Sequence, residues 1–556
     1  MTIRIQGTRR SGSASQWSCL ATPSESETST TSVQPNFCAT QSMSLKFCGY
    51  GSILERLLVD WSPDDSTSQL LEVDSAIARL SERSRELREQ INAKTPFLSL
   101  PAEIISEISM MACTPVYTAS EPDDFVVSRQ LTTPFNLGKT CRTWRHTVWA
   151  SPRCWNSIFL ELRRNAETYQ LQVALLEGWL SRSGDLPLCI HLELEDEPQQ
   201  WTRNPPTEVF DLLARYSHRW LHVSTFLVDP CWKQLEKFSL PRLTSLAVHP
   251  PMIGQDAGSK ANWRISDAPL LRNACITSFR NEIALPTHQL TQITLQFMDW
   301  QDCLSILSEC ATKLVHCALD ELKPGPVHST SPAAFTLPRL SSFSARCAYS
   351  NIHNPVLRLL DCITAPVLSR MQLGSDAEPS TAIRAFLSRS SCVLRELSLN
   401  TRYMQQNEPS LIALLADAEK LENLELICQK EGISDLILNH LNPARKQQPA
   451  AQVLLPNLRY FHYIGLMGFE LGTLVDMIDM RYRMAEDSGK TLGLRSEGDH
   501  NRVAKPTVFN INILKVVPSK RASLSASAET LRRLRKEHAG VTLSFSDEMS
   551  RARVYT

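Results

Sequence analysis

Residues 394–399 read Leu-Arg-Glu-Leu-Ser-Leu, a short phrase with leucine at its first, fourth and sixth positions. Its last three residues alternate between apolar and polar, which is the period-two pattern of a strand that buries one face. Leu397 and Leu399 would therefore point inward, and the residues on either side of them would point outward. One such strand cannot cover its own apolar side, so the phrase predicts that similar strands lie beside it.

The phrase L-x-x-L-x-L, or a close variant of it, recurs at a nearly constant interval. From residue 314 onward its first positions are 314, 340, 368, 394 and 421, a step of 26 to 28 residues. A period of this size is typical of leucine-rich repeats, whose stacked units share one continuous apolar core. The alternative is an unrelated α/β arrangement in which a leucine-rich chain matches the phrase by chance. The copies begin at Leu243, Leu290, Leu314, Leu340, Leu368, Leu394, Leu421 and Leu458, with a degenerate copy at Leu271.

Helical patterns fill the intervals between the copies, so we expect an α/β fold over residues 159–556. The Asn or Cys that follows the phrase in regular repeats is mostly missing, which predicts an irregular leucine-rich-repeat solenoid. Its C-terminal cap would include a mobile polar stretch after residue 484 and a basic helix with a solvated face. The predicted helices are 169–181, 208–217, 303–310, 383–389, 410–417, 471–484 and 529–538, and the predicted outer strands are 157–162, 188–194, 508–517 and 541–546.

Upstream of these repeats, the segment 96–158 contains two short amphipathic patterns. The first follows Pro101, which fits the first turn of a helix, and places Ile104, Ile105 and Ile108 on one apolar stripe. The second places Leu137, Cys141, Trp144 and Val148 at steps of four, three and four. Two helices this short cannot bury so much apolar surface between themselves. The excess must contact another part of the chain or another protein.

Three phrases in this segment resemble an F-box: Leu100-Pro101-Ala102-Glu103-Ile104-Ile105, Lys139-Thr140-Cys141-Arg142-Thr143-Trp144-Arg145 and Ser151-Pro152-Arg153-Cys154-Trp155. The sequence departs from the common pattern by a long inserted loop over 112–135. The resemblance implies that the segment docks the Skp adaptor of a cullin–RING ubiquitin ligase. It implies a core-forming and adaptor-binding set of Leu100, Pro101, Ile104, Ile105, Ile108, Leu137, Cys141, Trp144 and Trp155.

In an F-box/leucine-rich-repeat protein of the kind found in fungi, the repeats would bind a protein substrate and the chain itself would not be an enzyme. The substrate would contact the outward positions of the strands. Those positions are His316, Arg370, Gln372, Glu396, Ser398, Asn400, Asn423, Glu425, Tyr460 and His462. Two rivals remain: a repeat scaffold outside any ubiquitin ligase, whose two-helix element is only a cap, and an enzyme with a dispersed site.

A long helix is predicted over 68–95, directly before the F-box-like segment. Its apolar positions alternate at steps of four and three, which is the heptad pattern of a coiled-coil seam. The helix either lies on its own domain or associates with another helix through this seam. The seam residues are Val73, Ile77, Leu80, Ser84, Leu87 and Ile91.

Composition narrows the class of protein. The chain of 556 residues is too long for one core. Residues 1–50 are rich in Ser and Thr, and we predict a disordered tail over residues 1–67. Lys and Arg total 58, as do Asp and Glu, which argues against a nucleic-acid partner. No apolar run is long enough to span a membrane, so no membrane partner is predicted.

The sequence predicts neither a metal nor a cofactor. Its 16 cysteines include no C-x-x-C pair. Cys303, Cys310 and Cys317 are spaced by seven, but no histidine spacing completes a ligand set, so buried thiols in a reducing compartment are favoured. That compartment would be cytoplasmic, nuclear or both. Phosphate-binding, nucleophile-elbow and zinc-protease motifs are absent from the sequence.

Overall fold

The computed structural model shows two compact units. The helical unit consists of described residues up to Ile108 together with Phe135–Thr147, and the strand unit consists of Ser109–Cys113, Pro134 and the described residues from Val148 onward. The predicted F-box-like range 96–158 therefore divides between the units. The described ranges are 66–96, 100–113, 134–163, 166–194, 206–226, 238–249, 263–265, 267–277, 283–324, 334–347, 354–375, 379–401, 407–428, 432–443, 454–493, 510–518 and 541–545.

The first helices of the chain follow the sequence patterns with one exception. Helix α2 (Ser66–Ala93) matches the heptad segment, and α3 (Ala102–Cys113) starts directly after Pro101, whose carbonyl accepts the first backbone hydrogen bonds of α3. The predicted single helix after residue 136 is instead split into α4 (Pro134–Gly138) and α5 (Arg142–Ala150). A turn at Lys139 and Thr140 separates the two helices, with the Thr140 N–H donating to the carbonyl of Leu137.

Fifteen strands among the described residues form one entirely parallel sheet, and two further strand pairs are also parallel. The main path follows the chain order, so each strand lies between its predecessor and its successor. It comprises β1 (Ser157–Leu162), β2 (Leu188–Leu194), β3 (Trp220–Phe226), β4 (Ser245–His249), β6 (Asn273–Thr277), β8 (Gln292–Gln296), β9 (His316–Leu322), β11 (Ser342–Cys347), β13 (Arg370–Gly374), β14 (Glu396–Thr401), β15 (Asn423–Cys428), β17 (Tyr460–Gly468), β18 (Asn510–Pro518) and β19 (Val541–Phe545); β16 (Ile433–Ser434) pairs with β17.

All nine copies of the phrase become strands, each beginning two residues after the leading leucine. Neighbouring copies pair position by position, so that Met371 lies beside Leu397, and Leu397 beside Leu424. The fourth and sixth positions of every copy are buried. Burial of one leucine-sized side chain contributes about 1.5–3 kcal/mol, and the register makes these contributions continuous from strand to strand.

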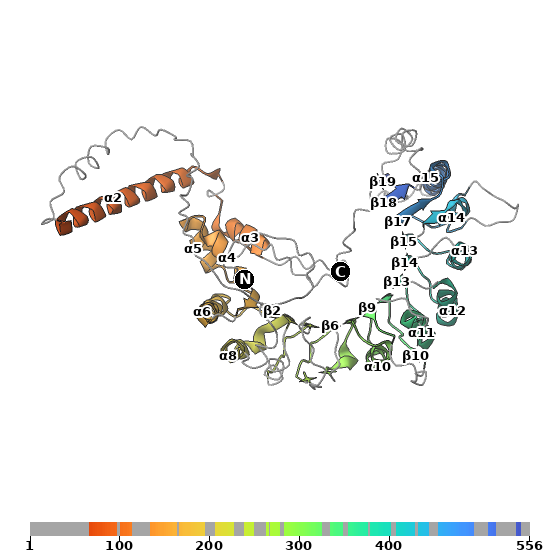
Figure 1. The fold of residues 1–556 in the computed structure, drawn as a ribbon, viewed down its shortest axis with the longest axis horizontal. Helices are drawn as coiled ribbons and strands as arrows, with labels where there is room; N and C mark the ends of the chain where they lie inside the picture. The colour runs from red at the N-terminus through yellow and green to blue at the C-terminus, as the bar shows by residue number, and fades with distance from the viewer. Residues whose placement is uncertain are drawn as a thin grey trace, which may run out of the picture. The chain divides into compact units, whose positions relative to one another are not determined.

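Helices connect the later strands and lie together on one side of them (Figure 1). They are α10 (Trp300–Cys310), α11 (Pro355–Cys362), α12 (Ser380–Ser390), α13 (Glu408–Asp417), α14 (Asp435–Leu441) and α15 (Leu471–Gly493). Earlier in the strand unit, α6 (Ala166–Arg182) and α8 (Thr207–Ala214) follow β1 and β2. The other side of strands β9 to β17 is not covered by these helices, and we call it the open face.

The C-terminal end differs from the prediction. Helix α15 continues through Gly493, so the polar stretch after residue 484 begins as helix rather than as a mobile loop. Residues 485–490 contain no proline to stop the helix, and it continues through Asp487, Ser488 and Gly489 despite their low helix propensity. The predicted strands at 508–517 and 541–546 are present as β18 and β19. The tail up to residue 65 and the predicted basic helix at 529–538 lie outside the described residues.

Buried arginines satisfy backbone carbonyls where helices end. Arg481 on α15 is only 3 % exposed and donates to the carbonyls of Leu441, Leu454 and Leu455, at 2.8, 2.5 and 2.7 Å. Burial lowers the pKa of this guanidinium to about 10, so the group remains charged at neutral pH. Because Leu441 is the last residue of α14 and Leu454 and Leu455 precede β17, Arg481 ties three segments together.

We predict that Arg481→Leu lowers the free energy of unfolding by about 2–4 kcal/mol, since it leaves three buried carbonyls without their charged donor. Urea unfolding followed by circular dichroism measures the change. The matched control is Arg483→Leu, because Arg483 is exposed on the same helix. Equal unfolding midpoints for the two variants would contradict the role assigned to Arg481.

Candidate functional site

The strands place the predicted substrate-contacting residues on the open face. The buried fourth and sixth phrase positions point to the helices, so the third, fifth and seventh positions point away from them. His316 lies on β9, and the other nine lie on the adjacent strands β13, β14, β15 and β17. The nine that follow β9 form a continuous polar surface, which we call the polar ladder: Arg370, Gln372, Glu396, Ser398, Asn400, Asn423, Glu425, Tyr460 and His462.

An arginine–carboxylate pair occupies the first row of the polar ladder. Arg370 and Glu396 are direct neighbours across β13 and β14. The guanidinium donates from Nε and Nη2 to the two carboxylate oxygens, at 2.6 and 2.9 Å. This bidentate hydrogen bond raises the pKa of Arg370. Both side chains are partly exposed, so the pair adds little to stability but presents an ordered charge pair to solvent.

The second row of the polar ladder contains a chain of three side chains centred on Glu425. The hydroxyl of Ser398 donates to one carboxylate oxygen at 2.6 Å, and Nδ1 of His462 lies 2.6 Å from the other. The hydrogen bond from His462 is the main cause that lowers the pKa of Glu425, with a further contribution from Ser398. The ring of Tyr460 contacts His462 edge-on, with centroids 6.2 Å apart.

Ser398 donates to one oxygen of the Glu425 carboxylate and His462 contacts the other, so the carboxylate lies between the two side chains. The carboxylate therefore organises the row, and the row offers hydrogen-bonding groups and one aromatic edge to a partner.

The sequence pattern also contained polar residues that the prediction missed, at the seventh phrase position. On β9 and β11, Nε of Arg346 donates to Asp320 at 2.8 Å. On the earlier strands, Nδ1 of His249 lies 2.7 Å from the hydroxyl of Thr277, which donates to Gln296 at 2.8 Å. Burial lowers the pKa of His249 to about 4, so this histidine is neutral. Extending the same alternation by two residues in every copy would have found them.

In the helical unit, the predicted adaptor-binding residues have unequal exposure. Ile104 on α3 is 46 % exposed, whereas the next residue, Ile105, is 1 % exposed. Pro101 is exposed as well, which leaves an apolar edge at the start of α3. The remaining members that lie in this unit are half-buried: Leu100, Ile108, Leu137, Cys141 and Trp144.

Trp155 differs from the prediction, because its ring is fully buried within the strand unit. Its indole nitrogen donates to the carbonyl of Val148 at 2.8 Å. The ring contacts Trp149 and Trp179 edge-on, with centroids 5.4 and 4.9 Å apart, and the guanidinium of Arg182 lies 5.2 Å from its centre. Trp155 therefore stabilises the core instead of facing a partner.

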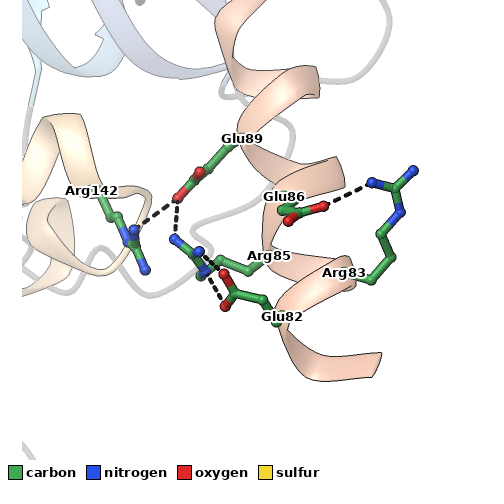
Figure 2. A network of polar contacts seen from close by, with 6 residues as sticks. All are labelled: Glu82, Arg83, Arg85, Glu86, Glu89 and Arg142. Atoms are coloured by element: carbon green, nitrogen blue, oxygen red, sulfur yellow. Dashed lines mark hydrogen bonds and ion pairs between the residues drawn. The ribbon is translucent and has the colours of Figure 1, made fainter. Parts of the chain in front are cut away.

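A network of ion pairs joins α2 to the start of α5 within the helical unit (Figure 2). Glu89 accepts from Arg85 at 3.2 Å and from Arg142 at 2.9 Å, and Arg85 also pairs with Glu82. Thr140, Cys141, Arg142 and Thr143 form one wall of an adjacent cavity of about 850 Å³, and α2 forms the other.

The three cysteines spaced by seven are free thiols buried in the strand unit. Burial is the main cause that raises the pKa of each, to about 12 for Cys310 and further for Cys303 and Cys317. Protonated thiols are poor nucleophiles and poor metal ligands. Over the part of the chain that the structure describes, no group of three or more ligating side chains is arranged to hold a metal ion.

Within the described ranges, no helix is both long enough and apolar enough to cross a bilayer. No family model matches the chain, and no curated protein is significantly similar to it.

We predict that Glu425→Gln lowers the free energy of unfolding by about 1 kcal/mol at neutral pH, because the amide cannot accept from both neighbours. The pKa of Glu425 in the folded state lies below its value in the unfolded state. The ionised carboxylate therefore stabilises the fold fully at pH values above the unfolded pKa of about 4.3. That contribution is lost as the pH falls through the lowered pKa, and the difference between variant and wild type should shrink there.

Urea unfolding at several pH values measures this dependence. Glu177→Gln is the control, because the exposed side chain of Glu177 on α6 has no partner among the described residues. A destabilisation by Glu425→Gln that stays constant down to acidic pH would contradict the assigned hydrogen-bond chain.

Proposed function

We propose that this protein is a substrate-recognition adapter of a Skp–cullin–F-box ubiquitin ligase. The F-box-like helices would dock the Skp adaptor, and the polar ladder of a leucine-rich-repeat solenoid would bind a protein substrate. The observation that supports docking most directly is the contrast on α3, where Ile105 anchors the helix and Ile104 beside it is left exposed. An exposed aliphatic residue one turn from the exposed Pro101 offers the apolar centre that a protein interface needs.

The repeat assignment is supported by the in-register strands. Each copy contributes one strand to the sheet, and most intervals contain a helix on the same side. The open face is consequently built from many short strands rather than one loop. Surfaces of this kind suit extended contact with another macromolecule.

A protein partner is favoured because the polar ladder mixes both charges with neutral groups. Arg370 is paired with Glu396, and Glu425 is hydrogen-bonded to Ser398 and His462, so the polar ladder carries no surplus of cations. A nucleic-acid partner would require a surplus of cations. In the proposed complex the chain would perform no chemistry itself, but would raise the effective concentration of a substrate lysine near the ubiquitin carrier.

One observation favours a second candidate, a repeat scaffold that is not attached to a ligase. Val148 and Trp155, at the end of the F-box-like segment, are buried within the strand unit. A segment that seals the first strand of a sheet is what a capping element would provide. In this alternative, the apolar side chains of α3 and α5 would cover the end of the repeats instead of binding an adaptor.

Co-purification with the Skp adaptor separates the two candidates. We predict that the wild-type chain binds the purified adaptor and that Ile104→Asp weakens binding at least tenfold, about 1.4 kcal/mol, because it places a carboxylate in an apolar contact. Leu171→Asp is the matched control, since Leu171 is 48 % exposed on α6 of the strand unit.

Circular dichroism spectra establish whether both variants remain folded. Adaptor binding that is absent in the wild type, or that is unchanged by Ile104→Asp, would reject the ligase assignment and favour the scaffold.

A further inference from the structure

Helix α2 presents an apolar seam that the structure leaves open to solvent. Its 28 residues extend about 42 Å at 1.5 Å per residue. The leucine and isoleucine side chains of the seam are between 41 and 67 % exposed, and Val73 is half-buried. These exposed fractions disfavour the interpretation that α2 packs its apolar seam against its own domain. The exposed seam residues are Leu70, Ile77, Leu80, Leu87 and Ile91.

The seam has the spacing of a two-stranded coiled coil. Leu70, Ile77, Ser84 and Ile91 occupy one core position of each heptad, and Val73, Leu80 and Leu87 occupy the other. The cavity beside the ion-pair network borders this seam, because Leu80 and Ser84 are among its lining residues. At Leu80 and Ser84 the seam therefore borders open space within the helical unit rather than a packed side chain.

We propose that α2 associates with α2 of a second copy of this chain as an antiparallel coiled coil. The charges that flank the seam support both the identity and the direction of the partner. Asp74 and Arg88 flank the seam on the same side, and neither forms an ion pair among the described residues. A two-fold axis near residue 81 would bring Asp74 of each copy against Arg88 of the other, as a self-complementary interface requires.

The parallel arrangement is disfavoured by the same residues. In a parallel, in-register pair, Arg83 of one helix lies opposite Arg88 of the other, and the contact occurs twice. Like charges in such positions destabilise the pair. The antiparallel pair has one such contact in place of two, between Arg83 of one copy and Arg83 of the other. Arg83 also forms an ion pair with Glu86 of its own helix at 2.8 Å (Figure 2).

The core of the antiparallel pair is apolar along most of its length. The register set by Asp74 and Arg88 places Ile77 against Leu87 of the second copy, and Val73 against Ile91. Ser84 meets Leu80, which is the one polar interruption and would weaken the centre of the seam. The expected product is a dimer that dissociates on dilution.

Sedimentation equilibrium of the full chain tests the proposal. We expect about twice the monomer mass of 62.6 kDa at high concentration. Ile77→Asp should weaken the dimer at least about tenfold. Leu71→Asp is the matched control, because Leu71 is also exposed on α2 but lies off the seam, and it should leave the dissociation constant unchanged. A wild-type monomer at every concentration, or a dimer insensitive to Ile77→Asp, overturns the proposal.

Charge exchange tests the direction without removing apolar surface. In the antiparallel pair, Arg88→Asp places two carboxylates together and should weaken the dimer roughly two- to tenfold, and adding Asp74→Arg should restore it. In a parallel pair, Arg88→Asp would remove the repulsion from Arg83 and tighten the dimer. Tightening therefore overturns the antiparallel assignment. These outcomes do not depend on adaptor binding.

Discussion

The strand unit depends on one constraint: consecutive strands pair in parallel with the same phrase position side by side. A single copy leaves two apolar side chains uncovered, and only its neighbours can bury them. Because the side-chain period of a strand is two, a slip of one residue would turn Leu397 and Leu399 toward solvent and Ser398 into the core. The buried rows from Phe343 to Phe461 show that the register is maintained over five successive copies.

The same register creates the polar ladder. Each outward side chain has a neighbour on the next strand, so Arg370 meets Glu396, and Glu425 meets both Ser398 and His462. The surface is thus ordered by its own contacts before any partner arrives. Irregularity in the intervals is absorbed elsewhere, by arginines such as Arg219, Arg389 and Arg481 that bond to otherwise unsatisfied carbonyls.

The helical unit is not held together by a continuous buried core like that of the strand unit. Its helices bury few side chains, and the ion pairs of α2, such as Arg85 with Glu89, lie between residues 82 and 89. Exposed ion pairs of this kind contribute little individually. An amphipathic helix gains most of its stability from burying its apolar face. The uncovered residues of α2 and α3 are therefore the positions where a partner would add the most.

The sequence by itself determined most strands of the main sheet and the buried positions of the nine copies, because a period of two and a recurring phrase need no distant information; short strands such as β16 carry no copy of the phrase. It also placed α2, and the ten outward residues that it selected lie on one face, although seventh-position residues such as Asp320 and Arg346 were missed. Only the tertiary structure showed that Trp155 lies in the core, that the predicted helix after residue 136 is split into α4 and α5, and that α15 runs on to Gly493. Burial and ion pairing join residues far apart in the chain, such as Trp155 with Trp179 or Glu89 with Arg142. Local periodicity cannot predict such contacts, because they depend on which surfaces meet after the strands and helices have formed.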